Sequence, residues 1–185
     1  MKFQLDSMQI LLHKKQLKYT GAELSPHFIY RNFGLLGDAL VAFAGECEVR
    51  EQLVDLEDSL NRDFIYSPKM LHFLLEHFGM GLAEAVARQR LFAAIIRELL
   101  PAGVRREGDD LYYRGGKLSV SIATVSPVSA LIHFGLNIET AGCPVAAAGL
   151  SDLKVKPFKL AQEACRIYRD EHNSIRKACC KVIPR

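Results

Sequence analysis

Short runs of apolar residues in the first third of the chain predict β-strands. Met8–Leu12, Gln16–Tyr19 and His27–Tyr30 are apolar, branched or aromatic, and Asp38–Val49 alternates in part between two faces. Glycine, proline and asparagine residues separate these runs and favour turns. We therefore expect an antiparallel meander. The acidic segment 51–63 is compatible with either a short helix or a loop.

The apolar pattern of the middle third predicts two helices. Ser67 and Pro68 have the residue types of an N-cap and a first helical position, and an apolar run follows them up to Phe78. A second run, Leu82–Leu100, keeps roughly helical spacing until Pro101 interrupts it. We expect one helix in each run.

Strands return in the last third before a final helix. Val104–Arg106, Leu111–Arg114, Lys117–Val125 and Ser129–Glu139 have strand character, and the alternation is clearest in Lys117–Val125. An irregular stretch follows, and an amphipathic helix is expected over about 157–183. This order predicts one α+β domain over residues 1–185, with a mixed, largely antiparallel sheet flanked by helices.

Composition narrows the class of protein. A net charge of +3 is far from the basic footprint of a dedicated nucleic-acid binder, so no nucleic-acid partner is expected. The five cysteines form no CxxC pair, so reduced thiols are the default expectation. No signal peptide and no apolar run of spanning length is visible, which predicts a cytoplasmic protein without a membrane partner.

Two motifs that suggest phosphate or metal binding fail on spacing. Gly115-Gly116-Lys117 lacks the upstream glycine and the following Ser or Thr of a phosphate loop, so a hairpin turn is favoured. His72 and His77 are five residues apart, whereas a zinc pair on a helix needs four. No metal site is therefore assigned to them.

An acidic group leaves another possibility open. Asp55, Glu57 and Asp58, with Asp38 upstream, could hold Mg²⁺ through one or two carboxylates, although such groups are more often solvated.

The stretch 104–140 carries the most chemistry. Acidic residues precede a tight turn, and Lys117 then opens a strand of small residues. Such an arrangement predicts a cleft over a sheet into which one ammonium group projects. That cation could hold a carboxylate, or stabilise charge that develops on a phosphoryl or acyl oxygen.

The same stretch resembles the biotin and lipoate protein ligases. Asp109-Asp110-Leu111-Tyr112, followed by Lys117, looks like the Asn-Asp…Lys signature of biotin ligases. The run 133–138 looks like the strand after it, which ends Gly-Ile-Asn-Val in that family. The resemblance covers about 40 residues well, and an uncharacterised small prokaryotic family within the superfamily is suspected to be closer. Residues 20–50 lack the Gly-Arg-Gly-Arg loop that binds the adenylate in the ligases, and Asp109 replaces the asparagine.

The resemblance implies acyl transfer or ligation on a small carboxylic acid, with ATP and Mg²⁺ as possible cofactors and a carrier protein as a possible partner. It makes Lys117 the contact to carboxyl or phosphate oxygens and Asp110 its orienting partner. Supporting substrate or nucleotide contacts are assigned to Arg105, Arg106, Asp109, His133 and Asn137.

Two alternatives remain open. The octanoyl- and lipoyl-transferase relatives use a lysine and a cysteine, for which Lys117 and Cys143 are the candidates, without ATP. The second alternative is a non-catalytic protein that has the ligase fold and binds a metabolite or a partner.

Overall fold

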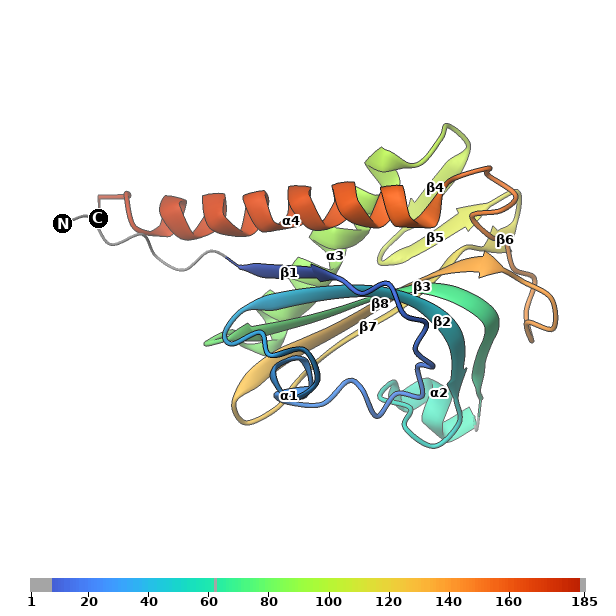
Figure 1. The fold of residues 1–185 in the computed structure, drawn as a ribbon, viewed down its shortest axis with the longest axis horizontal. Helices are drawn as coiled ribbons and strands as arrows, with labels where there is room; N and C mark the ends of the chain where they lie inside the picture. Colours follow the sequence, from blue (N-terminus) through green and yellow to red (C-terminus); the bar gives the residue numbers. More distant parts are fainter. Residues whose placement is uncertain (1–7, 62, 184–185) are drawn as a thin grey trace.

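The computed structural model describes residues 8–61 and 63–183, and its centre is a five-stranded sheet in the order β1-β2-β3-β8-β7 (Figure 1). The bounds are β1 Gln9–Leu12, β2 Ala39–Val49, β3 Ile65–Phe78, β7 Ser119–Val125 and β8 Ser129–Glu139. Strand β1 runs parallel to β2, and the other neighbours are antiparallel. The predicted mixed, largely antiparallel sheet is confirmed, but the parallel β1 means that the first third is no meander.

A smaller sheet lies beside the large one. It contains β4 Val104–Glu107, β5 Asp110–Tyr113 and β6 Gly116–Lys117, in that order. Lys117 pairs with Tyr112 of β5, whereas Ser119 already pairs with Leu136 of β8. The predicted strand Lys117–Val125 is thus divided at Leu118, where the chain passes from the small sheet into the large one.

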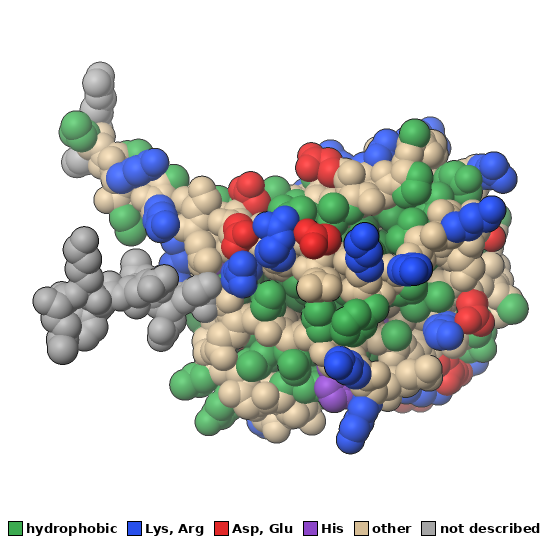
Figure 2. Space-filling view, turned by 45° about the horizontal axis from the view of Figure 1, so that its top comes forward, with side chains coloured by type: hydrophobic (Ala, Val, Ile, Leu, Met, Phe, Trp, Pro, Cys, Tyr) green, Lys and Arg blue, Asp and Glu red, His purple; other side chains and the backbone are tan. Residues whose placement is uncertain are grey.

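Two long helices cover one face of the large sheet. They are α3 Leu82–Leu99 and α4 Pro157–Cys179, so both predicted helices are confirmed, although α4 ends at Cys179. Their apolar sides meet alternate strand residues in the larger core, where Phe92 packs edge-on against Phe73, Phe134 and Tyr168. Figure 2 shows charges of both signs scattered over the outer surface on this side.

The opposite face holds a second core under short helices and loops. It includes Ile29 of α1 (Phe28–Phe33) together with Tyr19, Phe43 and Met70, and α2 (Leu56–Asn61) follows later in the chain. The predicted strand His27–Tyr30 is wrong. A short helix of six residues lies there instead, and Gly34, at φ 71°, ends it. The predicted strand Gln16–Tyr19 is reduced to a bridge between Tyr19 and Cys47.

The helix predicted after Ser67 is also wrong, because Ile65–Phe78 is strand β3. This strand lies between β2 and β8 and is buried on both faces, so its apolar residues run on without alternating. A continuous apolar run does not distinguish a buried strand from a helix. Pro68 is tolerated because the ladder is irregular on both sides, between Gly45 and Cys47 and between Lys69 and Met70.

Among the helices in 8–61 and 63–183, none combines the length and apolar character needed to cross a membrane. Residues 1–7, on which the expectation of no signal peptide partly rests, lie outside the described residues.

Candidate functional site

A cavity of about 590 Å³ lies on the sheet face opposite α3 and α4. Side chains of β2, β3, β7 and β8 form its floor, and the segments 52–58, 63–66 and 143–147 contribute walls. Gly135 is opposite Val120 in this floor, and a Cβ there would lie 2.3 Å from Met70 Sδ. The glycine therefore leaves the space that the Met70 side chain needs.

Lys117 lies in this cavity and is paired with a carboxylate. Its Nζ is 2.9 Å from Asp110 Oδ2, and both side chains are about one third exposed or less. Burial lowers the pKa of Lys117, but the hydrogen bond and charge of Asp110 outweigh it and raise that pKa above its usual value. Lys117 is therefore held as an ammonium ion.

Asn137 holds the backbone at Lys117. Its side-chain amide donates to the Lys117 carbonyl at 3.1 Å, and its backbone amide donates to the Leu118 carbonyl at 3.0 Å. The lysine thus leaves the crossing point between the two sheets in a fixed direction.

Asp109 anchors the hairpin rather than pairing with the lysine. One oxygen accepts hydrogen bonds from Gln89 Nε2 at 2.9 Å and Ser121 Oγ at 2.8 Å. The other lies 3.2 Å from Arg90 Nη2. Since Gln89 and Arg90 belong to α3, this carboxylate ties the β4–β5 turn to that helix.

His133 belongs to the cavity floor. Its ring stacks on Tyr19 with centroids 3.8 Å apart, and its Nε2 is 3.1 Å from His72 Nδ1. Burial lowers the pKa of His133 well below its usual value, and the neighbouring His72 lowers it further. The imidazole is therefore neutral.

Cys143 lines the same cavity as Lys117 and is half-buried. Burial raises the pKa of its thiol, and the hydrogen bond from Ser67 offsets this only in part. At neutral pH the group is a thiol, which is a weak nucleophile.

Arg105 and Arg106 are not among the residues that line the cavity. Both lie on the exposed part of β4, where Arg105 pairs with Glu107 at 2.9 Å and Arg106 donates to the Gly108 carbonyl. The structure thus gathers the other six predicted site residues around one cavity and leaves these two arginines outside its lining.

The lining of this cavity is rich in carboxylates. Asp55, Glu57, Asp58 and Asp63 lie along one wall, with Asp109 and Asp110 beside Lys117. Burial and the charges of Asp55 and Asp63 raise the pKa of Asp58. Asp38, which the sequence grouped with this wall, lies elsewhere. The sequence signalled the wall only by its acidity, and gave no sign that Tyr19 belongs to the site.

Relatives of high similarity are described without a function. "Uncharacterized protein MJ0805" of Methanocaldococcus jannaschii is 34% identical over 193 residues, which cover 98% of this chain and 87% of that protein. A solved structure described as a protein of unknown function from Pyrococcus horikoshi is 40% identical with a TM-score of 0.92. The match covers 97% of this chain and 100% of that one.

More distant structures have the same architecture. The putative lipoate protein ligase Ta0514 from T. acidophilum superposes with a TM-score of 0.61 at 14% identity, covering 90% of this chain and 85% of that one. A biotin acetyl coenzyme A carboxylase synthetase from Helicobacter pylori, with bound biotinylated ATP, gives a TM-score of 0.56 at 13% identity, covering 89% and 74%. These likenesses confirm the ligase-like α+β fold expected from the sequence.

The sequence profile of one family, described as a domain of unknown function (DUF366), matches residues 8–183, and the chain therefore belongs to the DUF366 family.

Proposed function

We propose that this protein activates a small carboxylic acid and transfers its acyl group, by way of an acyl-adenylate. The observation that carries the proposal is the Lys117–Asp110 pair, 2.9 Å apart, in a cavity of about 590 Å³. A cavity of this size suits a small ligand. The fold supports the class of reaction, because it is shared by a putative lipoate protein ligase and by a biotin acetyl coenzyme A carboxylase synthetase with bound biotinylated ATP.

Lys117 has a defined part in this chemistry. An oxygen of the acid attacks the α-phosphorus of ATP, the bond to pyrophosphate breaks, and the acyl-adenylate forms. An acceptor amine, such as one on a carrier protein, then attacks the acyl carbon, and AMP leaves. In each step the Lys117 ammonium would stabilise negative charge on the oxygens around the reacting centre. Asp110 would keep it oriented.

The carboxylates of the acidic wall could bind Mg²⁺ together with the phosphates of ATP. Lys117 is the only lysine or arginine that lines the cavity within the described residues, whereas Asp55, Glu57 and Asp58 lie on the wall. The triphosphate of ATP would therefore lie among more carboxylates than cationic side chains in this cavity. Mg²⁺ is commonly bound by one or two carboxylates together with substrate phosphates, so we expect strict dependence on Mg²⁺.

The test is ATP–pyrophosphate exchange with Mg²⁺ and a pool of biotin, lipoate, octanoate and amino acids. We expect exchange that depends on one acid. The Lys117→Ala variant should reduce it by about 10²–10³-fold, as for the loss of one donor to a developing charge. Lys69→Ala is the matched control, because Lys69 also pairs with a carboxylate, Glu139 at 3.2 Å, but does not line this cavity. No exchange by the folded protein with any acid would overturn the proposal, and ligand binding without exchange would favour a non-catalytic module.

A cysteine acyltransferase is the second candidate, because Cys143 lines the same cavity as Lys117. The thiolate would attack the carbonyl of an acyl donor, expel its leaving group and hold the acyl chain as a thioester. Intact mass after exposure to acyl thioesters tests this. An adduct that Cys143→Ser abolishes would support the transferase, whereas full turnover by Cys143→Ala would exclude it.

A further inference from the structure

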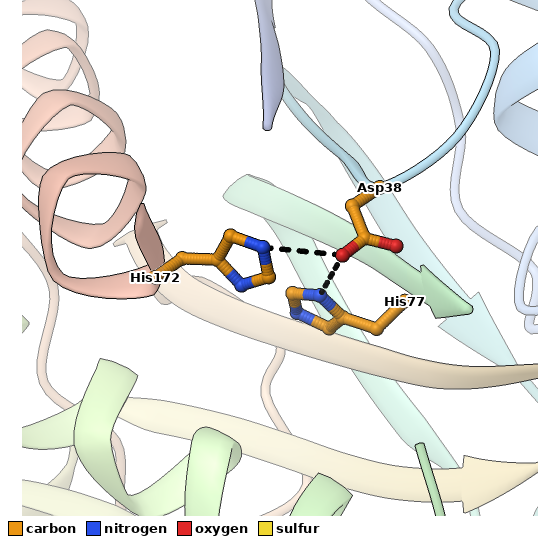
Figure 3. A group of neighbouring side chains, drawn as sticks. All are labelled: Asp38, His77 and His172. Atoms are coloured by element: carbon orange, nitrogen blue, oxygen red, sulfur yellow. Dashed lines mark ion pairs between the residues drawn. The ribbon is translucent and has the colours of Figure 1, made fainter. Parts of the chain in front are cut away.

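A second group of polar side chains lies at the other end of β3, on the helix-covered face of the sheet (Figure 3). Asp38 directly precedes β2, His77 is the last residue but one of β3, and His172 projects from α4. His77 and His172 are almost completely buried, with side chains 0% and 3% exposed, and the Asp38 side chain is 15% exposed. Three elements far apart in the sequence thus bring one carboxylate and two imidazoles together.

One ring nitrogen of each histidine faces the Asp38 carboxylate. Asp38 Oδ2 lies 3.1 Å from His172 Nε2 and 3.7 Å from His77 Nδ1, and neither contact has the geometry of a hydrogen bond. Buried polar atoms without a hydrogen bond are rare, since each costs desolvation free energy. A cation bound between these three atoms would satisfy both nitrogens and the carboxylate oxygen together.

Outer hydrogen bonds orient His77 and Asp38 within this group. His77 Nε2 is 2.9 Å from the Tyr168 hydroxyl, and Asp38 Oδ1 accepts a hydrogen bond from the Phe78 amide at 2.8 Å. Metal-bound histidines and carboxylates are typically fixed by such outer contacts. One donor atom of each residue stays directed at a common point.

The spacing of these three donor atoms fits a first-row metal ion. They all lie within 4.8 Å of one another. Tetrahedral coordination with bonds of about 2.0–2.1 Å places neighbouring donors about 3.3 Å apart. The observed separations of 3.1 and 3.7 Å bracket that value.

The charge surroundings of this group are compatible with a cation. Arg88 is the nearby positive group, and its Nη1 is also buried without a hydrogen bond. Its other terminal nitrogen pairs with Glu84 at 2.9 Å, which compensates the charge.

We propose that Asp38, His77 and His172 bind one divalent transition-metal ion, with Zn²⁺ as the expected occupant. Two imidazoles and one carboxylate suit Zn²⁺ better than Mg²⁺ or Ca²⁺, which prefer oxygen donors. The ion clamps α4 to the adjoining ends of β2 and β3. This site is separate from the cavity of Lys117, since from Met70 to His77 the strand spans about 23 Å at ~3.3 Å per residue.

The test uses the full chain, stripped with a chelator and titrated with Zn²⁺. At 100-fold excess over Kd we expect one bound ion and a rise in Tm of roughly 5–10 °C. Mg²⁺ should give no shift. His172→Gln should abolish the Zn²⁺-dependent shift, whereas His13→Gln and the double variant Cys179→Ser/Cys180→Ser should keep it. The double variant controls for adventitious binding at the exposed adjacent thiols.

A spectroscopic measurement keeps the proposal falsifiable if His172→Gln does not fold. Co²⁺ added to the wild-type protein should give the visible absorption of a tetrahedral or five-coordinate nitrogen and oxygen site. No saturable spectrum, or a thiolate charge-transfer band in the near ultraviolet, would overturn the assignment. Unchanged Zn²⁺ binding in a folded His172→Gln protein would do the same.

Discussion

The buried imidazoles of His72 and His133 make the free energy of unfolding depend on pH. Burial lowers the pKa of His72 to about 3, although the Gly45 carbonyl opposes this, and burial also lowers the pKa of His133 well below its usual value. The unfolded chain, with histidine pKa values near ~6.5, binds more protons below that pH. Stability is therefore full above about pH 6.5 and falls as the pH drops towards 3, by up to ~1.4 kcal/mol per pH unit for each histidine.

Urea unfolding at pH 7 and pH 5 measures this loss of stability. We expect the loss between the two pH values to be smaller in His72→Leu than in the wild type, whatever the variant's stability at pH 7. Equal losses in both proteins would show that His72 is not held neutral.

The thiol of Cys143 gives a second prediction at the level of one residue. Burial raises its pKa, so little thiolate exists near pH 7.5. Iodoacetamide should therefore modify Cys143 more slowly than the exposed Cys179 and Cys180, as peptide mass spectrometry over time would reveal. If Cys143 reacted first, the thiol would be activated and the transferase would gain support.

At the scale of elements, Gly45 allows the segment before α1 to lie against β2. The Leu17 amide donates to the Ala44 carbonyl at 3.1 Å, and a Cβ on Gly45 would stand 1.8 Å from the Leu17 carbonyl oxygen. Gly45→Ala must displace backbone, so we expect a loss of about 1–3 kcal/mol in the free energy of unfolding. Gly81→Ala is the control, because nothing lies within 4 Å of its Cβ position. Equal urea midpoints for the two variants would contradict the close approach.

The sequence predicted elements well where burial is one-sided. Helices α3 and α4 bury one stripe each, so pattern and structure agree. β8 is buried on both faces, and it was predicted because clear turn residues precede it. β3 was mistaken for a helix because neighbours on both faces remove its alternation. α1 was mistaken for a strand because six residues are too few to show helical periodicity.

At the scale of the whole molecule, the sequence indicates residues that a local motif joins, but not residues that only the tertiary fold brings together. The pairing of Lys117 with Asp110 was predictable, because one hairpin joins them and the local motif carries the family resemblance. Tyr19 and the acidic wall reach the cavity only through tertiary folding. Asp38 precedes β2, whereas His77 lies in β3 and His172 in α4, and no spacing in the sequence associates them.

The whole molecule is a sheet with a packed helical layer on one face and a cavity on the other. Phe92 of α3 is the centre of that layer, since it contacts Phe73, Phe134 and Tyr168 and has no exposed surface.

Phe92→Ala should lower the free energy of unfolding by about 3–5 kcal/mol through lost burial and a cavity. Phe158→Ala, at a side chain on α4 that is 48% exposed, should cost far less. Urea unfolding followed by circular dichroism measures both, and similar losses would mean that the layer is not centred on Phe92. Because Phe92 does not line the cavity of Lys117, folded Phe92→Ala protein should also keep the acid-dependent exchange of the wild type.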